Sequence, residues 1–310
     1  MTMPALTRRS ALFAAAALPF APALMPRAAH AAAEMLGAGM SPFNRFKLGG
    51  FEVTTLLGGS RPLENPQGTF GTNASPEDFA ALSEANFIPT DMSQNFFTPT
   101  VVNTGTELVL FDTGLAADAI TAALGAAGYT SDQIDVVVLT HMHGDHIGGL
   151  SGDAGVTFPN ARYIAGSVEH NHWSQAGSEG FDAKVRPLED KMTFIEGGAT
   201  VASGITAMNA FGHTPGHMAF MLESDGNSLL LAVDSANHYV WSLQKPDWEV
   251  RFDMDKATAA ATRKQVFGML AADRMPFIGY HMPFPGIGYV EPLDGGFRYV
   301  PATYQMMLNG

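Results

Sequence analysis

The sequence predicts an α/β fold, and two observations support this prediction. Within residues 107–146, two apolar runs flank a segment with apolar residues at helical spacing, so we expect strand, helix and strand in this order. Within residues 200–233, three strand-like runs follow one another and indicate a second sheet. No linker or low-complexity tract divides residues 32–310, so we expect one domain there.

Short apolar runs bounded by Gly, Pro and Asn predict the strands of the first half. These runs lie at residues 51–57, 100–103, 107–111, 136–139 and 161–165. Two helices are expected between them, the first capped by Ser75 and continuing to about residue 86, the second ended by Gly128. The segment 58–75 is long for a loop, so we expect a lid near the site or part of a dimer contact.

The second half is expected to be richer in strands. Strand-like runs lie at residues 200–211, 217–223, 228–233 and 277–280. Asp255 can cap a helix that runs to Asp273. At the other end of the domain, residues 32–50 are rich in Ala, Gly and Met, and we expect an extended, partly mobile lead-in.

The N-terminus has the pattern of an export signal. Arg8 and Arg9 precede an alanine-rich apolar run at residues 11–24, and small residues at 29–31 offer a cleavage site. We interpret residues 1–31 as a twin-arginine signal, which predicts a periplasmic or secreted protein. The alternative, a permanent membrane anchor, is disfavoured because the run is short and contains two prolines.

The charge and the cysteine content exclude some classes of function. The net charge is −13, and removal of the signal would take away three arginines and no acidic residue, which makes it −16. A field of this sign repels phosphate backbones, so nucleic-acid processing is not expected. The chain has no cysteine, and therefore no disulfide framework, thiolate ligand or nucleophilic thiol.

The strongest motif follows the strand at residues 136–139. His141, His143, Asp145 and His146 lie within six positions and are followed by two glycines. Imidazole nitrogen and carboxylate oxygen are ligands for zinc and similar divalent ions, and four such groups are more than one tetrahedral ion needs from a single loop. We therefore expect two metals here, and the alternative is a polar loop with solvated histidines.

Further candidate ligands occur at strand ends in the second half. His213 and His217 flank Thr-Pro-Gly, where Pro215 prevents a helix, so both rings are held by a turn. Asp234 ends a buried apolar run, where a carboxylate needs a cation or an ion-pair partner. His281 follows the last core strand in the same way.

These motifs resemble a known family. HMHGDH is similar to the HxHxDH signature of the metallo-β-lactamase superfamily. GHTPGH at residues 212–217, the acid at Asp234 and HMPFPGIG at residues 281–288 narrow the resemblance to the group of methyl parathion hydrolase and related lactonases. The resemblance runs from about residue 51 to 304 and implies a four-layer αββα sandwich.

The resemblance also implies roles for individual residues. One metal would be held by His141, His143 and His213, the other by Asp145, His146 and His281, with Asp234 bridging both. His217 and Asp112 would support the ligands, Asp145 would also shuttle a proton, and Trp173 would border the substrate pocket. His170 and His172 are expected on the surface.

The expected activity is hydrolysis by two divalent ions, with Zn²⁺ as the first choice, through a metal-bridging hydroxide. Lactones such as acyl homoserine lactones are the first candidates, followed by aryl esters and phosphotriesters of the methyl parathion type. We expect a small, apolar, uncharged substrate, no nucleic acid, no permanent membrane anchor, and a possible homodimer. The alternatives are an iron-dependent redox enzyme of the same fold and a non-enzymatic periplasmic binder of a metal or ligand.

Overall fold

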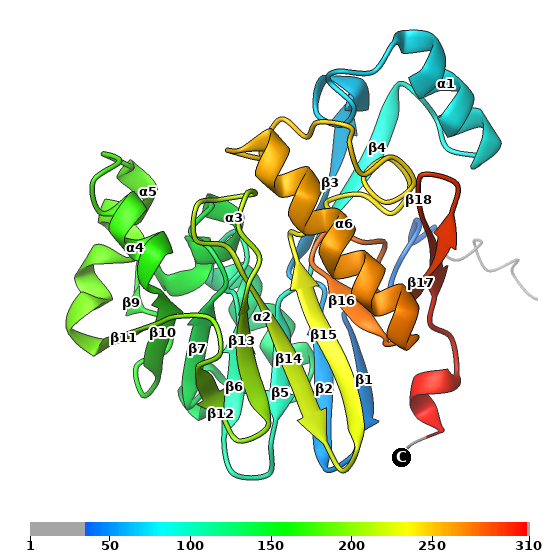
Figure 1. Cartoon of the computed structure of the whole chain (residues 1–310). Helices are drawn as coiled ribbons and strands as arrows, with labels where there is room; N and C mark the ends of the chain where they lie inside the picture. Colours follow the sequence, from blue (N-terminus) through cyan, green and yellow to red (C-terminus); the bar gives the residue numbers. More distant parts are fainter. Residues whose placement is uncertain (1–34, 309–310) are drawn as a thin grey trace, which may run out of the picture. The chain divides into compact units, whose positions relative to one another are not determined.

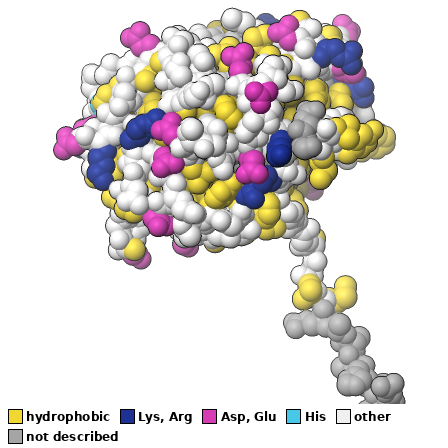
Figure 2. Space-filling model, turned by 90° about the horizontal axis from the view of Figure 1, so that it is seen from below, with side chains coloured by type: hydrophobic (Ala, Val, Ile, Leu, Met, Phe, Trp, Pro, Cys, Tyr) yellow, Lys and Arg dark blue, Asp and Glu magenta, His cyan; other side chains and the backbone are white. Residues whose placement is uncertain are grey.

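The computed structural model describes residues 35–308. A compact unit begins at Ser41, and residues 35–40 contain no helix or strand. The export signal predicted for residues 1–31 lies outside the described residues. Within the described part, no helix has the length and apolar character needed to cross a membrane. On the face shown in Figure 2, acidic and basic side chains are interspersed.

Two seven-stranded sheets form the centre of the unit (Figure 1). In spatial order, the first contains β1 (Phe43–Leu48), β2 (Phe51–Leu56), β5 (Thr100–Asn103), β6 (Leu108–Phe111), β7 (Val136–Leu139), β10 (Arg162–Gly166) and β11 (Met192–Ile195). The second contains β12 (Thr200–Ala202), β13 (Ile205–Asn209), β14 (Met218–Ser224), β15 (Asn227–Val233), β16 (Phe277–Gly279), β17 (Ile287–Leu293) and β18 (Gly296–Pro301). Two small pairs complete the strands, β3 (Gly59–Glu64) with β4 (Met92–Phe97) and β8 (Ser151–Gly152) with β9 (Gly155–Val156).

Helices cover the outer faces of both sheets. The α-helices are α1 (Pro76–Ala85), α2 (Ala117–Ala126), α3 (Gly144–Ile147), α4 (Ser167–Trp173), α5 (Glu179–Lys184) and α6 (Lys256–Asp273). Short 3-10 helices lie at Pro66–Gly68, Ser131–Gln133, Gly148–Leu150, Arg186–Lys191 and Gln305–Met307. Apolar residues of α2 and α5 pack on the first sheet, and those of α6 pack on the second (Figure 1).

The core between the sheets completes a four-layer αββα sandwich. Buried residues of both inner faces form one cluster, in which the rings of Phe111 and Phe220 lie 5.0 Å apart. Side chains alternate along each strand, so one face of each sheet packs in this core and the other face packs against the helices. The predicted fold class is therefore confirmed.

Most of the predicted elements are present with the predicted ends. Ser75 caps α1, since its side chain accepts a hydrogen bond from the backbone N–H of Asp78, and Asp255 caps α6 through the N–H of Thr258. The run predicted as one strand at residues 200–211 is a hairpin, because the chain turns at Gly204, whose φ is 73°.

Two predictions about loops are wrong, and one hairpin was not predicted. Residues 59–64 of the predicted loop form β3, which pairs with β4 in antiparallel register. Part of the predicted lead-in is β1, which pairs with β2 along six residues. After the last predicted strand the chain forms a further hairpin, β17 and β18. In each case a neighbouring strand satisfies the backbone groups of a segment whose own pattern is weak.

The topology brings four strand ends to one edge of the sandwich. β6 and β7 are parallel neighbours in the first sheet, and β15 and β16 are parallel neighbours in the second. Parallel strands end on the same side, so the residues that follow them meet there. These residues are Asp112, His141, Asp234 and His281.

Candidate metal centre

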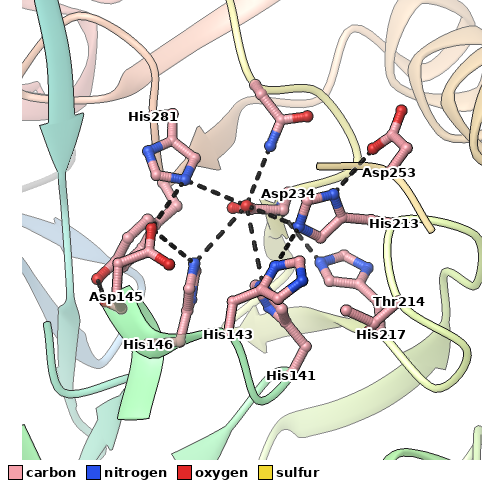
Figure 3. A network of polar contacts seen from close by, with 12 residues as sticks. His141, His143, Asp145, His146, His213, Thr214, His217, Asp234, Asp253 and His281 are labelled. Atoms are coloured by element: carbon pink, nitrogen blue, oxygen red, sulfur yellow. Dashed lines mark hydrogen bonds and ion pairs between the residues drawn. The ribbon is translucent and has the colours of Figure 1, made fainter. Parts of the chain in front are cut away.

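All seven predicted ligands converge at this edge (Figure 3). One set of ligand atoms comes from His141, His143 and His213, and within it the atoms lie within 4.8 Å of one another. A second set with the same spacing comes from Asp145, His146 and His281. The structure therefore brings together the two triads that the family resemblance implied, from both halves of the chain.

Asp234 lies between the two triads. Its Oδ2 is 3.2 Å from Nε2 of His213 in one set and 3.1 Å from Nε2 of His281 in the other. It is also 3.9 Å from Nε2 of His141 and 3.6 Å from Nε2 of His146. One carboxylate oxygen thus faces both sets, which is the arrangement required of a bridging ligand.

The backbone before Asp234 is strained. Val233 has a φ of 48°, in the left-handed region that a β-branched residue rarely adopts, and the pairing of β15 with β16 shifts register beside it. Strain of this kind persists only where the surrounding structure fixes it, and it is concentrated at functional sites. Here it turns the chain at the end of β15, immediately before the carboxylate.

The two glycines after the first motif allow a close approach of two loops. A Cβ at Gly149 would lie 2.1 Å from the carbonyl oxygen of Thr113. Thr113 also donates two hydrogen bonds, from its backbone N–H and its Oγ1, to the carbonyl oxygen of His146. Any larger residue would push the loops apart. The motif is therefore locked against the segment that follows β6.

Hydrogen bonds fix the ring orientation of three histidines. Nδ1 of His146 lies 2.8 Å from Oδ2 of Asp112, Nδ1 of His213 lies 2.8 Å from Oδ1 of Asp253, and Nδ1 of His281 lies 2.8 Å from the carbonyl of Phe96. Because these oxygens only accept, each Nδ1 carries a proton, so in the neutral ring Nε2 is the nitrogen whose lone pair faces the centre. Asp112 thus lies where the sequence predicted a supporting acid.

His217 makes different contacts from His213, although both come from one turn. Its Nδ1 donates to the carbonyl of Ala210 at 2.9 Å, and its Nε2 accepts from the backbone N–H of Asp234 at 3.2 Å. Burial lowers the pKa of His217 to about 4, so the ring is neutral. Both nitrogens are occupied, and the ring holds the backbone of the bridging residue.

Asp253 and Arg263 were not predicted from the sequence. Arg263 is buried and donates to the second oxygen of Asp253 at 2.8 Å, as well as to the carbonyls of Ser235 and Pro246. Burial alone would raise the pKa of Asp253, but the hydrogen bond from His213 and the charge of Arg263 hold it below its usual value. The acid therefore remains ionised behind His213.

Glu169 is a second residue that sequence reasoning missed. Its side chain is fully buried and accepts four hydrogen bonds. Oε1 accepts from the N–H of Met142 and from Nε1 of Trp173, and Oε2 accepts from Oγ1 of Thr214 and the N–H of Gly216, at distances of 2.6 to 2.9 Å. One carboxylate thus joins the loop of the first motif to the GHTPGH turn.

The structure places Trp173 beside the centre rather than in the cavity. Its ring lies 5.8 Å from that of His143, and its Nε1 points to Glu169. Among the described residues, it is not part of the cavity lining. His170 pairs with Glu189 at 2.8 Å, and His172 packs edge-on against Trp173, so neither joins the two triads.

The donor set fits metal ions. Nδ1 of His143 lies 3.1 Å from Nε2 of His141 and 3.0 Å from Nε2 of His213, so three ring nitrogens converge on one point. Burial lowers the pKa of His143 to about 3, which leaves a neutral ring. Converging lone pairs repel one another unless a cation lies between them.

Two buried atoms of the centre also have no partner among the described residues. They are Nε2 of His146 and Oδ1 of Asp234. A buried polar atom without a hydrogen bond is destabilising, and the side chains of both residues lie within the cluster of ligands (Figure 3). Imidazole and carboxylate donors of this kind fit divalent ions such as zinc.

A cavity of about 420 Å³ opens over the centre. The exposed sides of both triads form its floor, with His143, Asp145 and His281 among them. Its walls are mostly apolar and come from β3, β4 and loops of both halves of the chain. The apolar wall residues are Pro62, Leu63, Phe70, Phe97, Leu115 and Phe252, and the polar ones are Arg61, Asn95 and Asn237.

The chain belongs to the metallo-β-lactamase superfamily, whose family model matches residues 98–273, more than half of its length. Among solved structures it is similar to AidC, named a dizinc quorum-quenching lactonase and solved with a product bound. The two share 26% identity with a TM-score of 0.78, over 86% of this chain and 99% of that one. The predicted family and fold are thus confirmed.

Curated relatives match over shorter segments. An atrochrysone carboxyl ACP thioesterase of Cryptosporiopsis sp. (strain 8999) is 34% identical over 130 residues, which are 40% of this chain and 34% of that one. An N-acyl homoserine lactonase of Bacillus cereus is 22% identical over 148 residues, 47% of this chain and 56% of that one. The chain therefore spans about a third of the first of these relatives and about half of the second.

Proposed function

We propose that this protein is a binuclear metal-dependent hydrolase of ester-type bonds, with lactones as the first candidate substrates. The observation that carries the proposal is the pair of ligand triads joined by the carboxylate of Asp234 on the floor of an apolar cavity. The superfamily to which the chain belongs, and the names of the lactonases to which it is similar, point in the same direction.

In this proposal each triad holds one divalent ion, with zinc as the first choice. His141, His143 and His213 form one site, Asp145, His146 and His281 form the other, and Asp234 belongs to both. When bound, two such ions supply an activated water and stabilise negative charge on the oxygen of the scissile group. Seven ligands for two ions leave positions for water and substrate.

Asp145 is suited to move the proton. Its Oδ2 lies 3.4 Å from Nε2 of His281, the side chain is 24% exposed, and it lines the cavity. Hydrolysis forms one bond from water oxygen to the acyl carbon, breaks the bond to the leaving oxygen, and transfers a proton to that oxygen. Asp145 is the most exposed carboxylate of the centre, at 24% against 2% for Asp234, so it can carry this proton.

The cavity walls support an apolar acyl or aryl group next to the scissile bond. The volume of about 420 Å³ is typical of small-molecule sites, and Phe70, Phe97 and Phe252 provide flat apolar contacts. Acyl homoserine lactones and aryl esters combine such a group with an ester carbonyl. Phosphotriesters of the methyl parathion type are a further candidate.

A thioester is the second candidate, because one relative with 34% identity is named a thioesterase. Thioester hydrolysis requires the same attack on an acyl carbon, and differs in the leaving sulfur. Esters and thioesters therefore differ in the leaving group, and the residues of the metal centre do not distinguish between them.

The test is a hydrolysis panel with the zinc-loaded protein lacking residues 1–31. The panel contains acyl homoserine lactones, aryl esters, an acyl thioester and methyl parathion, and Asp234→Asn is the matched control. We expect lactone or aryl ester turnover that a chelator removes and that the control lacks. Oxygen consumption with a single bound iron, or ligand binding without turnover of any member, would overturn the proposal in favour of a redox enzyme or a binder.

Export is a separate proposal, supported by Arg8, Arg9 and the apolar run after them. We propose that the protein is exported folded and acts in the periplasm or outside the cell. Changing both arginines to lysine should keep the protein in the cytoplasmic fraction of cells that export the unaltered chain. Equal distribution of the two forms would contradict this assignment.

A further inference from the structure

Arg61 is the only arginine or lysine among the described residues that line the cavity. It lies on β3, whose partner β4 places Asn95 directly opposite it and Phe97 opposite Gly59. Side chains two apart on a strand, and those directly across an antiparallel pair, share one face. The face that carries Arg61 therefore also carries Leu63, Asn95 and Phe97, and all four residues line the cavity.

The guanidinium of Arg61 has no carboxylate partner among the described residues. Four other arginines among the described residues form ion pairs, including Arg162 with Glu107 and Arg298 with Glu291. Arg61 instead lies over the ring of Phe97, with 5.9 Å from its Cζ to the ring centroid. This contact leaves its N–H donors free to bind a ligand.

Phe97 connects this cation to the metal centre. Its ring packs edge-on against that of the ligand His281, with 5.5 Å between the centroids. Arg61 is thus one aromatic ring away from a residue of the second triad. A ligand whose reacting group lies over the triads can extend along Phe97 and reach the guanidinium.

The electrostatic character of the cavity follows from these positions. The acids of the floor, Asp145 and Asp234, face the metal ligands, and bound cations would neutralise them. The charge left on the wall is the positive one of Arg61, in a protein whose net charge is −13. A planar guanidinium with free donors matches the two oxygens of a carboxylate.

We propose that Arg61 is a specificity-determining residue that binds a carboxylate on the substrate, at the end of the group that lies along Phe97. This inference rests on the proposed function and names its substrate class: esters, lactones or thioesters that carry a carboxylate away from the scissile bond. It departs from the uncharged substrate expected from the sequence, where no pattern connected Arg61 with the motifs.

The experiment compares two esters with the same six-carbon acyl chain, mono-4-nitrophenyl adipate and 4-nitrophenyl hexanoate. Only the first ends in a carboxylate. The variants are Arg61→Met, which keeps an unbranched apolar side chain, and Arg61→Lys, which keeps the charge without the planar fork. Arg298→Met, at an exposed residue of β18, is the control for the loss of one positive charge.

We expect the ratio of kcat/KM for adipate over hexanoate to fall roughly 10- to 100-fold in Arg61→Met, the effect of losing charge-assisted hydrogen bonds. The ratio for Arg61→Lys should lie between those of Arg61→Met and the unaltered protein, and Arg298→Met should keep the ratio of the unaltered protein. Hydrolysis of both esters with an unchanged ratio in Arg61→Met would overturn the inference and leave the proposed function intact.

Inactivity toward both esters and the whole panel would instead count against the proposed function. The inference is then decided by binding of two unreactive analogues, the monoanilide of adipic acid and hexananilide, measured by calorimetry. Weaker binding of the adipic monoanilide to Arg61→Met, with unchanged binding of hexananilide, would support the carboxylate site. Equal binding of the monoanilide to both proteins would refute it.

Discussion

Nδ1 of His213 donates a hydrogen bond of 2.8 Å to Oδ1 of Asp253, which lies 40 residues later in the chain. The carboxylate accepts this bond and a second one from Arg263, so it cannot rotate away. Since the proton of the imidazole is held on Nδ1, its Nε2 is free to bind a metal. A distant acid therefore orients His213 for the ligand role that we propose.

Asp253→Asn should weaken metal binding. Arg263 can only donate, so the amide oxygen of Asn must face it, and the amide N–H then faces Nδ1 of His213. This forces the imidazole proton onto Nε2, where it blocks coordination. We expect a loss of roughly 10- to 100-fold in zinc affinity, measured by competition with a chromogenic chelator.

Asp247→Asn is the matched control, because Asp247 pairs with Lys264 on the surface. Its zinc affinity should equal that of the unaltered protein. If both variants bound zinc normally, the hydrogen bond to Asp253 would have no part in preparing His213.

Asp234→Ala should affect both metal sites at once. Its Oδ2 faces His213 and His281 at 3.2 and 3.1 Å, so the change removes the ligand that the two proposed metal sites share. We expect the metal content to fall from about two ions per chain and turnover to be nearly lost. Metal analysis of His170→Ala and His172→Ala should give the content of the unaltered protein, and loss of an ion in either would mean that a ligand has been assigned to the wrong histidine.

His213→Ala and His217→Ala should differ, although both residues lie in one turn. His213 offers a free Nε2 to the first triad, whereas both nitrogens of His217 are used by Ala210 and by the backbone of Asp234. We expect His213→Ala to lose one ion and nearly all turnover. His217→Ala should retain substantial metal, with activity reduced roughly 10- to 100-fold. The opposite order in metal analysis would require the two roles to be exchanged.

The buried ring of His238 should make the folded protein less stable in acid. Burial lowers its pKa from 6.5 to about 3, and its Nδ1 accepts from the N–H groups of Val240 and Trp241. Between these two pKa values the unfolded chain binds a proton at His238 and the folded chain does not. The contribution of His238 to the free energy of unfolding is therefore fully present above about pH 6.5 and is lost as the pH falls below that value. From about pH 7.5 to about pH 5.5 this group removes roughly 1.4 kcal/mol.

His238→Asn tests this contribution, because an Asn oxygen can accept the same two backbone bonds without titrating. Urea unfolding at the two pH values should show a smaller fall in stability for the variant, although loss of the ring stacked on Trp241 lowers its stability at both. An equal fall in both proteins would assign the acid sensitivity to other groups.

The candidate site was largely predictable where ligands are close in sequence. His141, His143, Asp145 and His146 occupy one loop after a buried strand, so spacing alone indicated metal chemistry. Asp234 and His281 were recognisable because each follows a buried run, where a polar side chain needs a partner. Their placement between or within two particular triads depended on the resemblance to a family.

The residues that the sequence did not reveal are single polar side chains in segments without a motif. Glu169 lies in a short helix and Asp253 in a loop, and neither differs locally from a surface acid. Arg61 lies in a segment predicted as a loop. Their roles depend on contacts between segments far apart in the chain, for example 40 positions between His213 and Asp253 and 47 between Glu169 and Gly216, which no local pattern records.

The missed strands have the same explanation. β3 contains Pro62 and Arg61, and β18 ends in Pro301, so neither has the apolar alternation of a core strand. β3 lies outside both large sheets, and β18 lies at the edge of the second. Pairing with a neighbour, rather than the pattern of the segment itself, determines such strands.

Glu169 couples the hydrogen exchange of two backbone amides that lie far apart in the chain. The N–H of Met142 and the N–H of Gly216 both end on its carboxylate, and a Cβ at Gly216 would lie only 2.2 Å from the backbone nitrogen of Glu169. Neither amide can open to solvent without exposing the buried carboxylate of Glu169, to which the other amide also donates. The two should therefore exchange with deuterium at a common rate, although they come from different halves of the chain, and Glu169→Gln should separate their rates.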